Sequence, residues 1–280
     1  MAAADTDRIG LIDRNSIPAF KLTDNDTIDF LARNASNPLP PNSPPLNWGS
    51  AVDAKRRLIF YKHIPPTSGK NDFEMRTRVL GVWDKRKASM MDLEHTLVKV
   101  GEGGKEEVYT KSFETAFFVG GGGWGGPRGP KIARYLPPKK SADVEATYQT
   151  TLESAHLYRL NGDYNPLHAD PPAGQAMGYP GIIMHGLFSW NVAASKVLKH
   201  FAQNEGTALR DFQARFTAPV RPGDKLDILM WDVGSVDGSE CDEVFKGEKL
   251  REIRFLVKVD EKTVLEDGRA LLDIKDTAKL

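Results

Sequence analysis

The sequence predicts an α+β fold of two halves, in which antiparallel sheets wrap around helices. Three observations support this class. A long amphipathic stretch is followed by four β-rich runs in the second half, three β-rich runs follow one another in the first half, and the Pro-rich segment RYLPPKKSAD lies between them. We therefore place the N-terminal half at residues 1–136 and the C-terminal half at residues 142–280.

The first half is predicted to be the less complete of the two. Its one candidate helix, NDTIDFLARNA (25–35), is short. Antiparallel strands are expected over residues 73–84, 91–100 and 106–120, where apolar and β-branched residues are frequent. The first half therefore resembles a trimmed copy of the second.

The second half is clearer. VEATYQTTL (144–152) has the composition of a strand, and a loop-like segment follows it. From Gly186 the apolar residues recur every three or four positions, which predicts a helix that ends near Gly206. Its apolar stripe consists of Leu187, Trp190, Ala194, Val197 and Phe201. Four β-rich runs then occupy residues 211–274, with turns expected at RPGD, VDGSE and LEDG.

Composition excludes several classes of protein. Thirty-eight Lys and Arg balance thirty-eight Asp and Glu, so no overall charge favours nucleic acid or an anionic membrane. No apolar run is long enough for a membrane span. The single cysteine, Cys241, has no neighbouring Cys and His at metal-binding spacing, so a zinc site is not expected. The partner is expected to be a small molecule or another protein.

The segment YRLNGDYNPLHADPPAGQAMGYPGIIMHGL (158–187) contains a candidate reaction centre. Asp163, Asn165 and His168 are spaced D-x-N-x-x-H, and Pro166 disfavours helix at Asn165, which predicts a rigid turn. A carboxylate beside an imidazole suits proton transfer, and an asparagine can orient water. No plausible Ser nucleophile stands in a G-x-S-x-G turn and no Cys is near, so water is the expected reactant. Asp and Asn are also common turn formers, so this triplet alone leaves a purely structural role open.

Over these thirty residues the sequence resembles the (R)-specific enoyl-CoA hydratases of the MaoC-like family, including the hydratase unit of peroxisomal multifunctional β-oxidation enzymes. The likeness extends to DFQARFTAPVRPGDKL, GVWDKRKASMM and FFVGGGGWGGPRGP, and covers roughly residues 50 to 275. Asn161 replaces the family's usual serine, and Arg221 stands where an apolar residue is usual.

The resemblance implies a double hot-dog fold with a trimmed first repeat. It implies that the first repeat, residues 1–136, shapes the acyl-binding groove, and that residues 142–280 carry the catalytic motif. Asp163 and His168 become the acid–base pair that holds the reacting water, Asn165 positions it, and the backbone N–H at Gly186 receives the thioester oxygen. Neither a cofactor nor a metal is expected. The other substrate contacts implied are Phe216, Lys85, His185, Tyr164, Pro166 and Leu167.

Some assignments stay open. His185 is either a contact to CoA or a buried histidine satisfied by the backbone, and His95 receives no role. Arg56 and Arg57, or Lys139 and Lys140, could bind the CoA phosphate. The family's His-Gly at the end of the first helix is replaced around Asp53 and Ala54, which leaves the acyl group undetermined.

The expected function is a hydro-lyase that adds water across the 2,3 double bond of a trans-2-enoyl-CoA to give an (R)-3-hydroxyacyl-CoA. One alternative is a dehydratase of a specialised polyketide or hydroxy-acid thioester, and another is a non-catalytic acyl-CoA-binding protein. The terminal Ala-Lys-Leu resembles an address read by the peroxisomal import receptor, which predicts a peroxisomal location. A homodimer is expected because cyclic dimers are the commonest oligomers.

Overall fold

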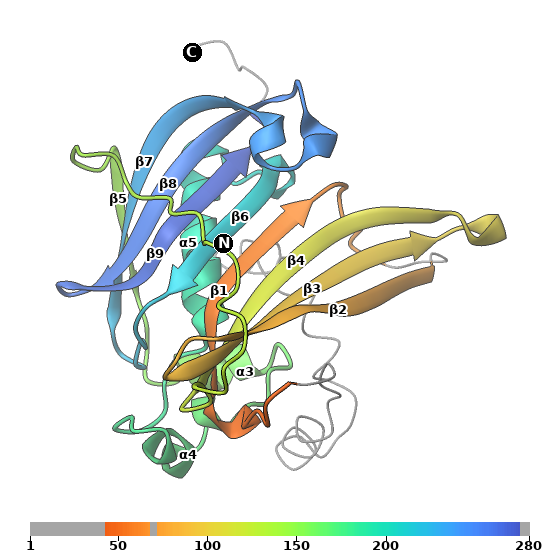
Figure 1. Ribbon diagram of the computed structural model, residues 1–280. Coiled ribbons are helices and arrows are strands. Elements are labelled where there is room, and N and C mark those ends of the chain that lie inside the picture. The colour runs from red at the N-terminus through yellow and green to blue at the C-terminus, as the bar shows by residue number, and fades with distance from the viewer. Residues whose placement is uncertain (1–42, 68–71, 275–280) are drawn as a thin grey trace.

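The computed structural model describes residues 43–67 and 72–274. Its strands form one nine-stranded sheet in the order β2-β3-β4-β1-β6-β9-β8-β7-β5 (Figure 1), and the pairings are antiparallel. The first half supplies β1 (Ala51–Phe60), β2 (Asp72–Asp84), β3 (Ala88–Val100) and β4 (Glu106–Val119). The second supplies β5 (Val144–Gln149), β6 (Leu209–Phe216), β7 (Lys225–Asp237), β8 (Lys249–Val259) and β9 (Lys262–Leu272).

The two halves repeat one strand order. From one edge the first half runs β2-β3-β4-β1, and the second half, apart from β5, runs β7-β8-β9-β6. The α+β double hot-dog class is thereby confirmed. The two expected sheets are joined, however, because β1 pairs with β6 and places Leu58 opposite Phe212. The exact boundary between the halves stays a prediction.

The helix of the second half is α5 (Gly186–Phe201), which packs against β5 to β9. Trp190, Ala194 and Val197 of the expected stripe are buried in the main core, which Phe212 and Phe255 complete. The helix ends at Phe201, whereas the sequence predicted an end near Gly206. Gln203 and Asn204 adopt left-handed backbone angles that a helix does not contain.

Some local expectations were wrong. Asp53 and Ala54, where the family's His-Gly is replaced, lie in strand β1. The LEDG segment (265–268) lies inside β9, where Asp267 takes a φ of 53°, and the turn between β8 and β9 falls at Asp260, with a φ of 51°. Asp and Gly therefore mark an irregularity within the strand here, not its end. The candidate helix at 25–35 lies outside the described residues.

A partly buried ion pair crosses the junction between the halves. The Asp211 side chain on β6 is fully buried, and its Oδ2 accepts a hydrogen bond of 2.7 Å from Nη2 of Arg57 on β1. Such a pair resists separation because breaking it leaves a charge away from water.

Candidate active site

The segment between β5 and α5 is more ordered than the loop expected from sequence. It contains the short helices α3 (Ser154–Arg159) and α4 (Pro171–Ala176), and a 3-10 turn at Pro166–His168. None of the helices in the described ranges is long and apolar enough to cross a membrane.

The predicted rigid turn is present. Asn165 has a non-helical backbone (φ −54°, ψ 121°), and its side-chain oxygen accepts a hydrogen bond of 3.1 Å from the Leu167 N–H. Oδ1 of Asp163 accepts one of 3.1 Å from the Asn165 N–H. These bonds fix both side chains, and they leave the Asn165 amide group as a donor.

His168 is held in one orientation by the backbone. Its residue is 7% exposed, and Nδ1 lies 2.9 Å from the Ile183 carbonyl oxygen. A carbonyl accepts only, so Nδ1 carries the proton and Nε2 keeps its lone pair. Burial lowers the pKa of His168, although the Asp163 carboxylate opposes that shift. The imidazole is therefore suited to accept a proton.

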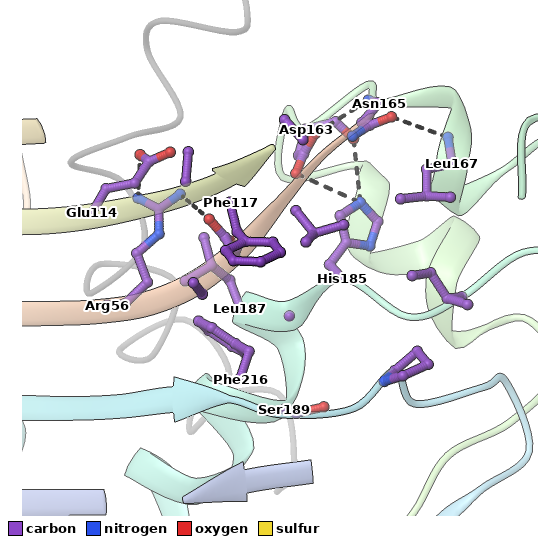
Figure 2. Close-up of a pocket in the computed structure, with 18 of the residues that line it drawn as sticks. Arg56, Glu114, Phe117, Asp163, Asn165, Leu167, His185, Leu187, Ser189 and Phe216 are labelled. Atoms are coloured by element: carbon purple, nitrogen blue, oxygen red, sulfur yellow. Dashed lines mark hydrogen bonds and ion pairs between the residues drawn. The ribbon is translucent and has the colours of Figure 1, made fainter. Parts of the chain in front are cut away.

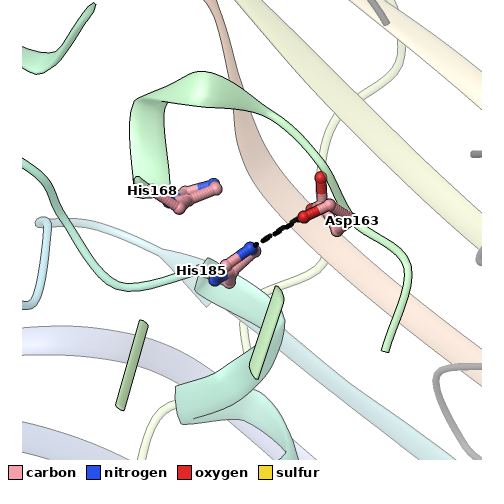
Figure 3. Close-up of side chains that lie close together, drawn as sticks. All are labelled: Asp163, His168 and His185. Atoms are coloured by element: carbon pink, nitrogen blue, oxygen red, sulfur yellow. Dashed lines mark hydrogen bonds and ion pairs between the residues drawn. The ribbon is translucent and has the colours of Figure 1, made fainter. Parts of the chain in front are cut away.

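His185 precedes α5 and stacks on His168 (Figure 3). The ring centroids are 3.8 Å apart. Nε2 of His185 lies 3.4 Å from the Asp163 carbonyl oxygen and 4.0 Å from its Oδ2, while Nδ1 has no hydrogen-bond partner among the described residues. Burial, followed by the neighbouring His168, lowers the pKa of His185 to about 3.

These three side chains are also a possible ligand set. Asp163, His168 and His185 offer ligand atoms within 4.8 Å of one another. A carboxylate with two imidazoles can hold a divalent cation. The expectation that the reaction needs no metal stays a prediction.

A cavity of about 980 Å³ joins this site to the first half of the sheet. In Figure 2, Asp163, Asn165 and His185 lie at one end, Arg56 and Glu114 at the other, and Phe117, Leu187 and Phe216 between them. The cavity reaches the upper end of the volume usual for small-molecule sites.

The first turn of α5 reaches the cavity at Gly186. A Cβ built at this position would lie 2.9 Å from the Phe216 ring, so no side chain fits here without movement of Phe216. The N–H groups that begin a helix have no helical partner and carry partial positive charge. Backbone donors at this position can stabilise an oxyanion.

The predicted site residues are brought together in part. Asp163, Asn165, Leu167, His168, His185, Gly186 and Phe216 line the cavity. Lys85, Tyr164 and Pro166, which were also predicted to contact the substrate, are not among the described residues that line the cavity. Lys85 donates to the Arg128 carbonyl instead, and the Tyr164 ring lies 5.0 Å from the Arg159 guanidinium carbon. Arg56 and Arg57, considered for the CoA phosphate, are instead paired with carboxylates.

Sequence reasoning missed the charged end of the cavity. Asp53, Arg56, His95 and Glu114 line it, although they lie on three different strands. The strand register brings them together, placing Arg56 opposite Glu114. The available signal was a charged or titratable residue within the β-rich run of each of these strands.

Comparison with known proteins agrees with the fold. The MaoC like domain family matches residues 135–252. A probable dehydratase, NIT22 of Ajellomyces capsulatus, is 51% identical over 261 residues, which are 92% of this chain and 68% of that protein. A MaoC-like dehydratase from Phytophthora capsici has a TM-score of 0.76 at 23% identity, covering 97% of this chain and 84% of that one.

The mouse peroxisomal multifunctional enzyme type 2 is 31% identical over 191 residues, which are 68% of this chain and 25% of that protein. This chain therefore spans only a quarter of that relative. The double hot-dog fold and these relatives define an enzyme of the hydratase and dehydratase class. The chain belongs to the MaoC-like family.

Proposed function

We propose that the protein hydrates a trans-2-enoyl-CoA reversibly to an (R)-3-hydroxyacyl-CoA. The observation that carries the proposal is the Asp163 carboxylate beside a buried His168 whose Nε2 is free to accept a proton, in the cavity that the start of α5 also reaches. Relatives support the substrate class: proteins of Dictyostelium discoideum and Arabidopsis thaliana carry the name enoyl-CoA hydratase 2.

In the proposed reaction Asp163, His168 and Asn165 hold one water molecule. Nε2 of His168 takes a proton from this water as its oxygen bonds to C3, and the Asn165 amide orients the oxygen. Electrons of the double bond move toward the thioester oxygen, where the Gly186 N–H stabilises the charge. The proton that His168 takes from the water is passed on to C2 by way of the Asp163 carboxylate, so both groups end in the states in which they began.

The experiment follows the near-ultraviolet absorbance of the conjugated thioester. Purified protein is given crotonyl-CoA and then decenoyl-CoA, beside a His168→Ala variant of unchanged circular dichroism. We expect absorbance to fall with the wild type and at least about a hundredfold more slowly with the variant. An (R)-specific dehydrogenase coupled to the reaction then reports the configuration. Equal rates for the two proteins would rule out the role given to His168.

A second candidate is dehydration of a specialised polyketide or hydroxy-acid thioester. The relative at 51% identity is named a probable dehydratase, and the charged residues of the cavity are unusual for binding a plain hydrocarbon chain. An increase in absorbance with a 3-hydroxyacyl-CoA, together with no loss of absorbance from straight-chain enoyl-CoAs, would favour it.

We also propose a peroxisomal location and a homodimer. Relatives from mouse and Arabidopsis thaliana are named peroxisomal, and this supports the location. The terminal Ala-Lys-Leu lies outside the described residues. Co-localisation of the native protein with a peroxisomal marker, and sedimentation equilibrium of the purified chain, test the two statements.

A further inference from the structure

The cavity has a second polar region, centred on Arg56 and Glu114, which lie at the other end from Asp163 and His185 in Figure 2. Asp53, Arg56, Thr77, His95 and Glu114 line the cavity and contact one another, and we call them the polar cluster. They lie on the four strands of the first half. A hydrocarbon chain placed over them would remove their water and return no hydrogen bond.

The cluster is a continuous chain of contacts. Nη2 of Arg56 lies 3.1 Å from Oδ1 of Asp53, and Nη1 lies 2.7 Å from Oε2 of Glu114. The same Glu114 oxygen is 3.4 Å from Nε2 of His95, whose Nδ1 is 2.9 Å from the Thr77 hydroxyl. Two carboxylates therefore share one buried guanidinium.

The Asp53 carboxylate is the member of the polar cluster that can accept a further hydrogen bond. An ionised carboxylate has two acceptor oxygens. Among the described residues, the side chain of Asp53 accepts a hydrogen bond from Arg56. Its side chain is 25% exposed and borders the cavity, whereas that of Arg56 is 7% exposed. An acceptor on Asp53 is therefore available to a ligand in the cavity.

The charges also limit which group can bind there. Burial raises the pKa of Asp53 to about 6. Burial also acts to raise the pKa of Glu114, but the neighbouring Arg56 and His95 outweigh it and hold that pKa at about 2. Both carboxylates are thus ionised near neutral pH. Two carboxylates against one guanidinium leave a net negative charge, and the Asp163 charge also acts on Asp53, so a substrate anion would be repelled. A neutral hydroxyl donor meets no such repulsion.

We propose that the polar cluster is a subsite for a hydroxyl group on the acyl chain of the substrate, with the Asp53 carboxylate accepting its hydrogen bond. The inference rests on the proposed function, because it assumes that the ligand is an acyl-CoA. It narrows the substrate to thioesters whose chain carries a hydroxyl beyond C3. A charge-assisted hydrogen bond in a partly dry cavity gives both affinity and selectivity.

The test measures binding and needs no turnover. Decanoyl-CoA is compared by calorimetry with isomers that carry one hydroxyl at successive carbons beyond C3; none has the double bond or the 3-hydroxyl needed to react. We expect at least one isomer to bind the wild type about tenfold more tightly than decanoyl-CoA, the effect of one hydrogen bond to a charged group. In Asp53→Ala this advantage should vanish, and in Asp53→Asn it should shrink.

Asp227 supplies a matched control. It is also a strand aspartate, 3.1 Å from the cation of Lys225, and its side chain is 32% exposed, but it lies away from the cavity. Asp227→Ala and Asp227→Asn should keep the tenfold preference. Asp53→Asn preserves the size of the side chain, so it serves as the second variant if Asp53→Ala folds poorly.

The outcomes separate the two proposals. If decanoyl-CoA and its isomers bind equally well, or if Asp53→Ala and Asp53→Asn weaken all of them to the same extent, the polar cluster is only a structural ion network and the subsite is refuted. If no acyl-CoA binds, the proposed function fails as well.

Discussion

The imidazoles of His168 and His185 are stacked, with ring planes 28° apart and centroids 3.8 Å apart. At this distance one protonated ring strongly disfavours protonation of the other. Both rings are also buried, so the pKa of each is lowered. The pair is thereby kept neutral, which preserves the lone pair of His168 for proton transfer.

The pH dependence of catalysis should show that His168 acts as a neutral base. A protonated His168 cannot accept a proton, so kcat/KM should fall as the pH falls. The midpoint of this acid limb should lie below 6.5, the ordinary value for histidine, because burial lowers the pKa of His168. Rates measured from pH 4 to 8, about the range in which histidine and carboxylates titrate, check it. A midpoint above 6.5 would contradict the neutral pair.

Stability should depend on pH through His185. In the unfolded chain His185 gains a proton near pH 6.5, whereas in the folded protein it does so only near pH 3. The unfolded state therefore binds more protons between these values, and the free energy of unfolding falls as the pH is lowered through this window.

A His185→Phe variant should reduce this slope by up to about 1.4 kcal/mol per pH unit. Urea denaturation at a series of pH values measures it. His63→Phe, at an exposed position, supplies the control for replacing a histidine by phenylalanine. An unaltered slope in His185→Phe would show that the folded protein does protonate His185 normally.

Gly186→Ala should damage the active site. The new Cβ would meet the Phe216 ring at 2.9 Å, which displaces either the ring or the start of α5. We expect kcat/KM to fall about tenfold or more, because misplaced oxyanion donors lose that much. Phe216→Leu in the same chain should restore part of the activity. Gly181→Ala is the control, since a Cβ there meets nothing within 4 Å.

The ion pair across the junction should matter for stability. Asp211→Ala removes the carboxylate partner of Arg57, whose own side chain is 26% exposed, and should lower the free energy of unfolding by about 1.5–3 kcal/mol. Glu243→Ala, which breaks an exposed pair with Lys246, should change it by less than about 1 kcal/mol. Chemical denaturation compares the two variants. Similar small losses in both would mean that Arg57 finds water or another acceptor.

The sequence predicted the features that depend on residues close together in the chain. β-rich composition located most of the strands, the three-and-four spacing located α5, and Asn165 with Pro166 predicted the turn that holds Asp163. Strand β1 was missed because its run DAKRR is charged. Those charges are satisfied by distant partners: Arg57 by Asp211, and Arg56 by Glu114.

The polar end of the cavity was missed for the same reason. Nothing in the neighbourhood of His95 or Glu114 along the chain connects them to Arg56. Their meeting depends on the register of β3, β4 and β1, which is set by the whole sheet. Local patterns cannot contain such contacts.

The pairing of β1 with β6 has a consequence for how the enzyme is assembled. If the two halves were separate molecules, each would expose an unpaired strand at this edge, and a working cavity would form only when two molecules met. Because one polypeptide carries both halves, their association is intramolecular and has a fixed effective concentration. Formation of the cavity is therefore independent of how dilute the protein becomes.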